Sequence, residues 1–450
     1  MSKVPVLPPS GFRDFLPAEA SARQKLNDVI AETYLSHGFQ RIGMAVMENL
    51  STLQGKGGGG DNEKLIFKVL KRGEELNRAV AAGDPSQLGD MGLRFDLTLP
   101  LARYCARFRE QLPKPFKVFQ VGSVWRADRP QKGRYREFVQ CDVDVVGAKE
   151  LGAEVDCIAA ILEVFRAVKL EGVEVHLNDR RLLSALRGEL EEKTWGEALI
   201  TLDKLDKVGP EGVEKELIEK LGNVPAGIAA LIGTPEERSA EPARTHRSDD
   251  FSKYHEDSVQ SLNEIVSLLR EEAPGVKIVF NPSLVRGQDY YTGTIFEIRH
   301  PDLSGSLGGG GRYNHLLEVF GAQETPAFGG SIGFERLFLL LQEKGSLEDE
   351  NVPHVFIPLL SPGLRLKVNA IARNLRARGI RADTYPDAAK LKNQFKYADD
   401  RRIPFTLIMG EEELNRGEAK LKNMLARTEE ALALEPLETF LQRMETLCLK

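Results

Sequence analysis

The chain has few cysteines and no cysteine motif. No two of them form a Cys-x-x-Cys pair; they are Cys105, Cys141, Cys157 and Cys448. Structural zinc sites and disulfide-rich domains rely on closely spaced cysteines, so we expect neither protein-bound zinc nor a disulfide framework. A protein of the reducing cytoplasm fits this composition.

Long apolar runs are missing as well. No stretch approaches the ~20 apolar residues that span a bilayer, and residues 1–9 lack the apolar core of a secretion signal. We therefore expect no association with membranes. With 450 residues, 42% of them hydrophobic and 28% charged, the chain should fold into two or three globular domains.

The overall charge is small but unevenly spread. A net charge of -6 argues against a protein that coats nucleic acid nonspecifically. Residues 361–402, however, carry 11 Lys and Arg against 4 Asp and Glu. Such a basic patch suits a partner that touches one end of the molecule with its phosphates. A solvated helix face is the alternative, and it is the commoner origin of a charge run.

Hydrophobic spacing predicts the main elements of the first part. Three segments have the apolar spacing of helices: 17–36, 149–169 and 256–272. Strand-like runs at 116–128 and 136–147 enclose a basic Pro/Gly loop and predict a hairpin. Because no helix separates these strands, a largely antiparallel sheet is expected. The glycine-rich stretch 55–60 lacks the Gly-Lys-Ser/Thr of a phosphate loop, and we interpret it as a loop.

Two later stretches change in character. Residues 181–255 are rich in Leu, Glu, Lys and Ala at helical spacing, which predicts a helical insertion into a domain formed by residues 1–345. In residues 352–450, strand-like and helical segments alternate. The sequence therefore predicts an α+β domain built on an antiparallel sheet with a helical insertion, followed by an α/β domain with a partly parallel sheet.

The first polar cluster lies in residues 94–100. Asp96 and Thr98 would share one face of an extended chain, where their oxygens can accept hydrogen bonds from a substrate ammonium group. An acid at a strand end that caps a neighbouring element is the alternative.

The predicted hairpin carries the second cluster. Arg126, Arg134 and Arg136 flank its tip and are expected to converge on a polyphosphate. Gln140 and Asp144, with Asp142 between them, alternate with apolar residues and therefore share a face. That face is either exposed to solvent or the floor of a substrate site, and the nearby arginines favour the floor.

Two further clusters combine glycine with arginine or tyrosine. Residues 284–293 hold Arg286, Tyr290 and Tyr291 between glycines, and an ordinary exposed turn is the alternative interpretation. Glycine runs at 308–311 and 329–333 precede Arg336, which lies near the start of a predicted helix. Helix N-termini and glycine-rich backbone favour anionic ligands, although glycine also permits simple close packing.

Together these clusters resemble the histidyl-tRNA synthetase family of class II aminoacyl-tRNA synthetases. Residues 119–138 resemble motif 2 of the class, and residues 333–336 resemble motif 3. Residues 286–291 and 310–313 are similar to two signatures peculiar to this family, and residues 11–17 resemble its amino-terminal motif. The resemblance covers nearly the whole chain. Among the departures, Ala45 stands where motif 1 usually has proline, and Gln288 stands where leucine is usual.

The resemblance implies a role for each matching residue. The catalytic residues would be Arg126, Arg286 and Arg336. ATP would be bound by Arg126, Arg134, Arg136 and Arg336. Arg129 and Gln131 would face the acceptor end of tRNA. Histidine would be bound by Asp96, Leu97, Thr98, Arg126, Gln140, Asp144, Arg286, Tyr290 and Tyr291.

It also implies an activity and partners. Residues 1–345 would be a class II catalytic domain, and residues 352–450 an α/β anticodon-binding domain. The protein would be a homodimer that joins L-histidine to tRNA(His) with ATP and Mg²⁺. The alternative is a catalytically silent relative, the regulatory histidine-binding subunit of ATP phosphoribosyltransferase. That relative typically lacks the anticodon-binding tail and has lost pocket residues, whereas this chain has the tail and the pocket residues. A nonenzymatic RNA-binding module would explain the basic tail but not the arginine–glycine clusters.

Overall fold

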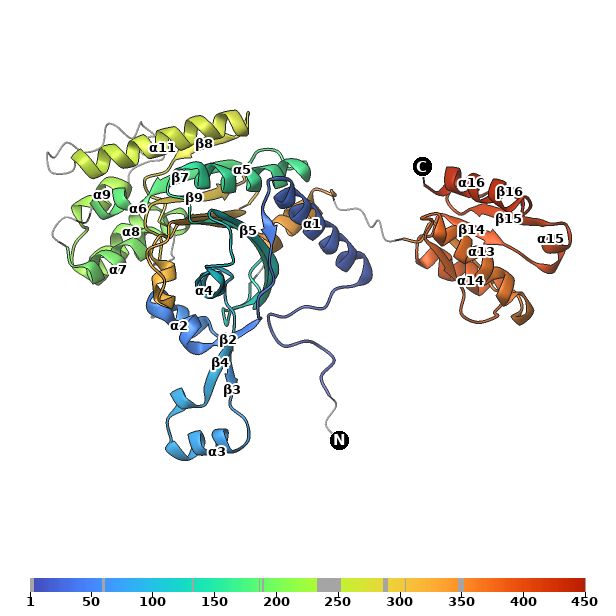
Figure 1. Ribbon diagram of the computed structural model, residues 1–450, viewed down its shortest axis with the longest axis horizontal. Helices are drawn as coiled ribbons and strands as arrows, with labels where there is room; N and C mark the ends of the chain where they lie inside the picture. Colours follow the sequence, from blue (N-terminus) through green and yellow to red (C-terminus); the bar gives the residue numbers. More distant parts are fainter. Residues whose placement is uncertain are drawn as a thin grey trace. The chain divides into compact units, whose positions relative to one another are not determined.

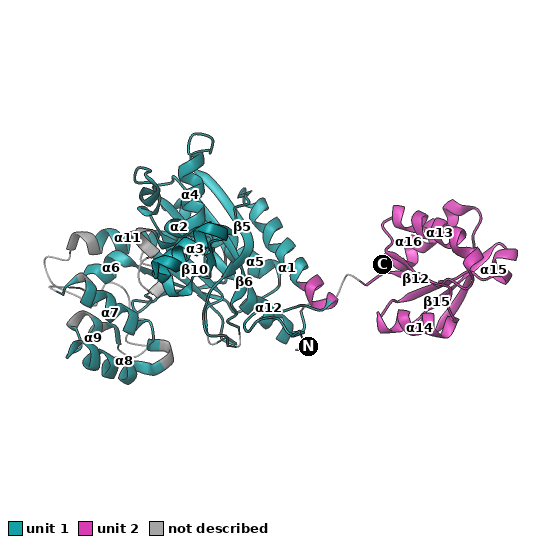
Figure 2. Ribbon diagram, turned by 90° about the horizontal axis from the view of Figure 1, so that it is seen from below, with its two compact units in different colours: residues 1–16, 23–347 teal, residues 17–22, 348–450 magenta. Residues whose placement is uncertain are grey.

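The structure is a computed structural model that describes residues 4–58, 61–131, 133–185, 187, 190–232, 252–285, 290–303, 305–346 and 352–449. The chain divides into two units, which Figure 2 shows in separate colours. One unit comprises residues 1–16 and 23–347, and the other comprises residues 17–22 and 348–450. Each unit contains a β-sheet of its own.

An eight-stranded sheet organises the larger unit. Its strands, in spatial order, are β1 (Gln40–Arg41), β5 (Phe116–Trp125), β6 (Glu137–Val146), β11 (Ala327–Gly333), β10 (Gly308–Arg312), β9 (Thr294–Arg299), β7 (Glu174–Asp179) and β8 (Lys277–Phe280). Only β1–β5 and β7–β8 pair in parallel among these strands. The largely antiparallel sheet is confirmed, as is the hairpin, in which β5 and β6 stay in register from Phe116↔Val146 to Trp125↔Glu137.

Helices cover both faces of this sheet (Figure 1). On one side lie α5 (Gly152–Ala167) and α11 (Ser252–Glu272), and on the other lies α4 (Thr98–Phe108). α5 is buried almost all round, with Ile158, Ile161 and Phe165 fully inaccessible, because it lies between the sheet and α11. The predicted helices at 17–36, 149–169 and 256–272 are confirmed by α1 (Pro17–Ser36), α5 and α11.

The insertion region is helical in its described part. Its helices are α6 (Arg180–Ala185), α7 (Glu192–Leu202), α8 (Leu205–Leu221) and α9 (Ala226–Ile232). Trp195, Leu202 and Leu217 are buried in a core that also includes Leu284 and Ile295 of the main domain. This shared core attaches the helices to the sheet. Residues 233–251 of the predicted insertion lie outside the described residues.

The glycine-rich stretch at 55–60 was predicted to be a loop, and this is wrong for residues 55–58. They form the end of α2 (Leu50–Gly58), whose residues Leu50 and Leu53 are buried against α4. Burial at the start of the helix outweighs the low helix propensity of glycine. Next to α2 is a small sheet of β2 (Met47–Asn49), β4 (Gly89–Leu93) and β3 (Lys68–Leu70), with α3 (Gly73–Ala82) between β3 and β4.

The smaller unit has a five-stranded sheet in the order β13 (Ala382–Thr384), β12 (Val355–Ile357), β14 (Phe405–Ile408), β15 (Glu418–Asn423) and β16 (Thr428–Ala433). The first three strands are parallel and the last two add antiparallel pairs. Its helices are α13 (Arg365–Ala377), α14 (Leu391–Asp400), α15 (Glu411–Asn415) and α16 (Leu437–Cys448). The predicted α/β fold with a partly parallel sheet is confirmed.

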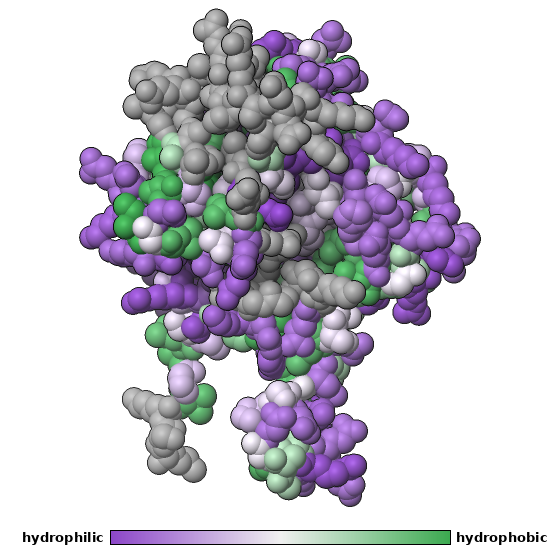
Figure 3. Space-filling model, turned by 90° about the vertical axis from the view of Figure 1, so that its left-hand side faces the viewer, coloured by the Kyte–Doolittle hydropathy of each residue, from purple (hydrophilic) through white to green (hydrophobic). Residues whose placement is uncertain are grey.

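The surface drawn in Figure 3 is mostly hydrophilic, and its hydrophobic side chains form small patches. Exposed apolar side chains in the insertion helices include Ile200 at 58% and Ile218 at 48%. Within the described part of the chain, no helix combines the length and the apolar character that a membrane crossing requires.

Candidate active site

A cleft of about 510 Å³ opens over the large sheet. Strands β6, β9, β10 and β11 contribute to its walls, together with the hairpin tip and the start of α12 (Phe334–Glu343). The residues marked by the sequence that line it are Asp96, Thr98, Arg126, Arg134, Gln140, Asp144, Tyr290, Tyr291 and Arg336. Segments separated by more than two hundred residues therefore meet in one cavity.

Three carboxylates form the deepest part of the cleft. Asp96, Asp142 and Asp144 are only 2%, 3% and 2% exposed. Asp142 and Asp144 alternate along β6 and face the cleft, as the sequence predicted for this strand. Among the described residues, Asp96 Oδ2 and Asp144 Oδ2 have no hydrogen-bond partner. Buried acids normally have partners, so these two oxygens mark a place for a ligand that donates hydrogen bonds.

The electrostatics of these acids favour a cationic ligand. Burial raises the pKa of Asp96 to about 6 and that of Asp142 to about 7, and the nearby Arg126 opposes both shifts. Burial, reinforced by the charge of Asp142, raises the pKa of Asp144 well above its ordinary range. A bound cation would stabilise the ionised carboxylates and reverse these shifts.

Three tyrosines stand beside the acids. The ring centroids of Tyr290 and Tyr291 are 4.9 Å apart, and those of Tyr290 and Tyr313 are 6.0 Å apart. Tyr290 shares a side-chain hydrogen bond with Thr98, and the Tyr313 hydroxyl donates to Asp144 Oδ1 at 2.6 Å. No role for Tyr313 was predicted from the sequence. Its position two residues after the glycine run 308–311 was the available signal.

Glycines allow the floor to form. A Cβ atom at Gly329 would lie 1.8 Å from Asp144 Oδ1, so any side chain there would displace the carboxylate. A Cβ atom at Gly310 would lie 1.9 Å from the carbonyl oxygen of Gly329 on the neighbouring strand. The glycine runs therefore leave room for Asp144 between closely packed strands.

Three arginines line the cleft next to this floor. Arg126 donates through Nε to the Phe95 carbonyl oxygen at 2.9 Å. Arg134 is held by Asp128, with Nε to Oδ2 at 2.9 Å, and Arg336 Nη1 donates to the Ser306 carbonyl oxygen at 2.8 Å. Arg126 and Arg134 lie in the loop between β5 and β6, and Arg336 lies in the first turn of α12. Converging guanidinium groups suit a polyanion such as a polyphosphate.

Other predicted residues lie elsewhere. Arg136 is not among the cleft-lining residues; its Nη1 donates to the Ser10 carbonyl oxygen at 3.1 Å. Leu97 lines a second cavity, of about 450 Å³, instead. Arg129 and Gln131 are exposed near the hairpin tip. Arg286 lies outside the described residues.

The extended chain predicted for Asp96 and Thr98 is wrong, although both side chains line the cleft. Thr98 is the first residue of α4, and the Leu99 amide donates to Asp96 Oδ1 at 3.2 Å. Asp96 thus caps a helix with one oxygen and leaves the other without a described partner. Pro100, which is tolerated in a first helical turn, was the signal for a helix start.

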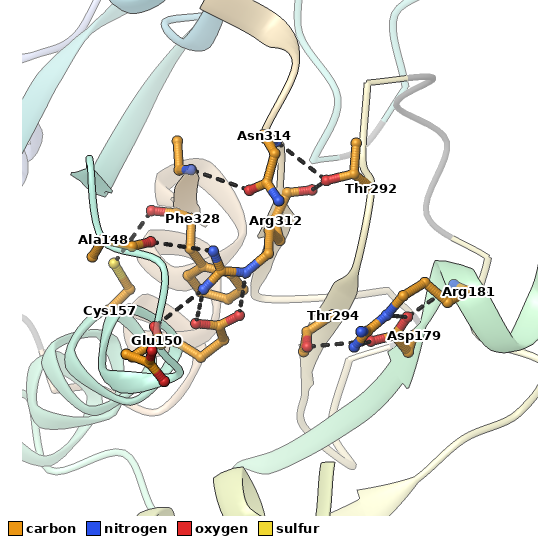
Figure 4. A network of polar contacts seen from close by, with 12 residues as sticks. Ala148, Glu150, Cys157, Asp179, Arg181, Thr292, Thr294, Arg312, Asn314 and Phe328 are labelled. Carbon is orange, nitrogen blue, oxygen red and sulfur yellow. Dashed lines mark hydrogen bonds and ion pairs between the residues drawn. The ribbon is translucent and has the colours of Figure 1, made fainter. Parts of the chain in front are cut away.

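A buried ion pair joins the glycine-rich strand β10 to α5. Arg312 Nε donates to Glu154 Oε1 at 2.6 Å, and Arg312 Nη1 donates to the Ala148 carbonyl oxygen at 3.3 Å (Figure 4). The Arg312 carbonyl oxygen accepts from the Thr292 amide at 2.7 Å. Arg312, at the end of β10, thus links α5 to Thr292, which directly follows Tyr291.

A second buried ion pair fastens the amino-terminal segment to the cleft wall. Glu335, at the start of α12, binds Arg13 and Arg23, with Arg23 Nη2 to Glu335 Oε1 at 2.6 Å. The guanidinium carbon of Arg13 lies 3.4 Å from the centre of the Tyr135 ring in the hairpin. Glu335 Oε1 also accepts from the Val139 amide at 3.4 Å. This network connects the hairpin with the helix that carries Arg336.

Two family models match the chain. The model described as histidyl-tRNA synthetase matches residues 11–337, and the model described as anticodon binding domain matches residues 354–444. A histidine–tRNA ligase from Leifsonia xyli subsp. xyli is 42% identical over 396 residues, which is 83% of this chain and 92% of the relative.

Solved structures resemble this chain as well. Histidyl-tRNA synthetase from Nostoc sp. PCC 7120 has a TM-score of 0.79 and 27% identity, and the match covers 98% of this chain and all of that chain. A Bacillus halodurans protein described as an ATP phosphoribosyltransferase regulatory subunit/histidyl-tRNA synthetase has a TM-score of 0.70 and 19% identity, covering 88% and 97% of the two chains; it shares the fold. The chain belongs to the histidyl-tRNA synthetase family.

Proposed function

We propose that this chain is a histidine–tRNA ligase, which activates L-histidine with ATP to histidyl-adenylate and pyrophosphate and then transfers the histidyl group to the 3′ end of tRNA(His). One observation carries the proposal: a single cleft combines buried carboxylates that lack described partners with a group of arginines. An amino acid needs the first group for its ammonium, and ATP needs the second for its phosphates.

Histidine binds over the carboxylate floor in this proposal. Asp96, Thr98 and Gln140 hold the α-ammonium group, while Asp144 and Tyr291 pair with the imidazole nitrogens. The unpaired oxygens of Asp96 and Asp144 support these roles. A site with such buried polar atoms rejects analogues that leave them unpaired, by roughly 10⁴–10⁵-fold in comparable enzymes.

ATP lies beside the histidine, with its phosphates among the arginines. Arg126 and Arg336 contact the phosphates, and Arg134 assists from the hairpin. Arg286, by resemblance, stabilises charge at the α-phosphorus while the histidine carboxylate attacks. Activation of this kind depends on alignment and charge compensation rather than on a covalent enzyme intermediate. For Arg136, the resemblance alone supports a contact with ATP.

Aminoacyl-tRNA synthetases use ATP with a divalent metal, and we propose Mg²⁺ here. Glu297 lines the cleft and carries carboxylate oxygens, the donor type that Mg²⁺ prefers, and Arg299 binds one of them, Oε2, at 2.8 Å. When it arrives with ATP, the ion supplies positive charge to the pyrophosphate oxygens. Glu297 would be the residue that holds the ion, and the arginines would hold the phosphates.

The other proposals concern the domains, the contacts with tRNA and the pairing with a second copy of the chain. We propose residues 1–345 as the catalytic domain, with the insertion at 181–255, and residues 352–450 as the anticodon-binding domain, supported by the model match at 354–444. Arg129 and Gln131 are exposed, as an acceptor-end contact requires. The family resemblance supports a homodimer. The four free cysteines fit the cytoplasm.

A regulatory subunit is not favoured. The Bacillus halodurans protein shows only that the fold is shared. The anticodon-binding match at 354–444 and the predicted residues that do line the cleft favour the ligase.

The decisive experiment is histidine-dependent exchange of pyrophosphate into ATP, followed by charging of tRNA(His) with labelled histidine. We expect exchange with L-histidine and none with the other common amino acids. A purified, folded protein that binds histidine but catalyses no exchange would contradict the ligase and favour the regulatory subunit.

A further inference from the structure

Asp142 lies in the middle of the cleft floor, and the roles proposed above do not use it. It is 3% exposed and lines the cleft between Gln140 and Asp144 on β6. The strand register places it beside Gln120 of β5 and Ser331 of β11. Burying a carboxylate is costly unless it is paired or hydrogen-bonded, so the contacts of Asp142 indicate its role.

Two polar side chains face Asp142. Ser331 lies opposite it on β11 and opposes the rise in its pKa, while the Ser331 hydroxyl donates to the Ile332 carbonyl oxygen at 3.5 Å. Gln140 donates through its amide, whose Nε2 lies 3.4 Å from Asp142 Oδ1. The opposite side of that amide, Gln140 Oε1, is buried and has no partner among the described residues. Gln140 thus keeps an acceptor available inside a site that is otherwise tightly packed.

The chemistry of the two groups settles the orientation of the amide. An ionised carboxylate only accepts hydrogen bonds, so the side of the Gln140 amide that faces Asp142 must be its NH₂ group. The carbonyl oxygen then has to point the other way. If Asp142 were replaced by a group that both donates and accepts, either orientation of the amide would satisfy the contact.

We propose that Asp142 is a positioning residue for amino-acid binding, which holds the Gln140 amide with its oxygen turned toward the α-ammonium group of the substrate. This inference rests on the proposed function and deepens it, since it concerns how the same site recognises an amino acid. A reversed amide would present NH₂ to the ammonium group, and two donors would face each other.

The surroundings of Asp142 make this positioning dependent on pH. Burial raises the pKa of Asp142 to about 7, the Ser331 hydroxyl opposes the rise, and the charge of Asp96 adds to it. A protonated Asp142 can donate to Gln140 Oε1 and so reverse the amide. The groups facing Asp142 from the neighbouring elements are Gln120, Ser331, Gln140, Asp144, Asp96, Arg94 and Arg126. Recognition of the ammonium group should therefore weaken as the pH falls below about 7.

The test compares two ligands by calorimetry. One is L-histidine, and the other is its α-hydroxy analogue, in which a hydroxyl replaces the ammonium group. We expect Asp142→Asn to weaken histidine binding by ~10–100-fold, as for loss of a charge-assisted hydrogen bond, and to change analogue binding by less than ~3-fold. The ratio of the two dissociation constants, measured in one preparation, does not depend on the fraction of folded protein.

A double-mutant cycle separates positioning from simple charge. If Asp142 acts through Gln140, then Asp142→Asn adds less than ~3-fold in a Gln140→Ala background. If the full loss persists in that background, Asp142 acts by its own charge and the proposal is wrong. Asp302→Asn, at a side chain that is 57% exposed, is the matched control and should leave the ratio unchanged.

The pH profile is the second readout. In the unmodified protein the preference for histidine over the analogue should shrink between pH 8 and pH 6, whereas in Asp142→Asn it should shrink less, because only Asp96, with a pKa of about 6, still titrates beside the ammonium group. The α-ammonium group of histidine lowers the pKa of its imidazole relative to that of the analogue, so the titration of each free ligand is measured separately and subtracted. If the unmodified protein lacked histidine-dependent exchange, the proposed function would be wrong. If exchange were normal and the ratio of the two dissociation constants were equal in the unmodified protein and in Asp142→Asn, only the role of Asp142 would be wrong.

Discussion

Buried carboxylates occur in two settings in this molecule, and the settings differ in their partners. Glu154 and Glu335 are paired with arginines, and their side chains are 0% and 6% exposed. Asp96 and Asp144 are buried as deeply, yet each keeps one oxygen without a hydrogen-bond partner in the described part of the chain. The paired acids hold elements together, and the unpaired ones are available to a ligand.

The pKa directions of Glu335 and Asp144 reflect the same difference, whereas burial raises the pKa of Glu154 in spite of its hydrogen bonds and ion pair with Arg312. Burial pushes the pKa of Glu335 upward, but hydrogen bonds and charge from Arg23 and Arg13 bring it below its ordinary value. For Asp144 burial prevails, and the neighbouring Asp142 raises the pKa further. A buried acid with a raised pKa weakens the empty fold at neutral pH and gains from a bound cation.

The largest effect is expected from breaking a paired acid. Glu154→Ala leaves the Arg312 guanidinium buried without its carboxylate, which should lower the free energy of unfolding by about 3–5 kcal/mol. Denaturant unfolding would measure it. A loss of unfolding free energy below about 1 kcal/mol would mean that the pair contributes little to stability, and the contrast between paired and unpaired acids would then fail.

Neutralising an unpaired acid should give the opposite pattern. Asp144→Asn should lower histidine-dependent pyrophosphate exchange by ~10²–10³-fold, because a polar contact to the substrate is lost in a buried site. Its thermal stability without ligand should equal or exceed that of the unmodified protein. Normal exchange combined with a lowered melting temperature would reverse the assignment of Asp144.

The pH dependence of stability sharpens the comparison. The pKa of Asp96 is about 6 in the folded protein, against about 3.9 in an unfolded chain. The folded state therefore binds more protons, and the contribution of Asp96 to stability falls as the pH rises through about 6. Asp96→Asn should match the unmodified protein near pH 4 and exceed it at pH 8, by on the order of 2 kcal/mol. Melting curves across this range would show a constant difference if the shift were absent.

The smallest effect is expected at Arg134. Its side chain is 50% exposed, and its partner Asp128 already satisfies it. Exposed ion pairs contribute ~1 kcal/mol or less. Arg134→Ala should raise KM for ATP by only ~2–5-fold and leave the melting temperature unchanged. A larger loss than that of Arg126→Ala would show that the hairpin tip, rather than its base, holds the phosphates.

Local features of the fold could be predicted from the sequence. The helix at 17–36 and the hairpin of β5 and β6 follow from periodicity and turn residues, which act over short distances. The hairpin of β15 and β16 escaped prediction, because most residues of β16 are exposed and show no hydrophobic alternation. The helix start at Thr98 was missed because the chain was taken as extended, although Pro100 marked a helix start and a capping role for Asp96 was the alternative.

The partners of the site residues could not be predicted, because they are distant in the chain. Tyr313 and Asp144 are 169 positions apart, and Arg312 and Glu154 are 158 apart. Arginines in glycine-rich or hairpin motifs look alike in a sequence. Only the fold shows that Arg126 lines the cleft, whereas Arg312 is buried with Glu154 and Arg136 binds the amino-terminal segment.

The most direct test of this account is a crystal structure with bound L-histidine. The account predicts that the α-ammonium nitrogen lies about 2.7–2.9 Å from Asp96 Oδ2, and that an imidazole nitrogen lies equally close to Asp144 Oδ2. It also predicts that the Glu154–Arg312 pair is unchanged. Histidine bound elsewhere, or bound here with both oxygens still unpaired, would contradict it.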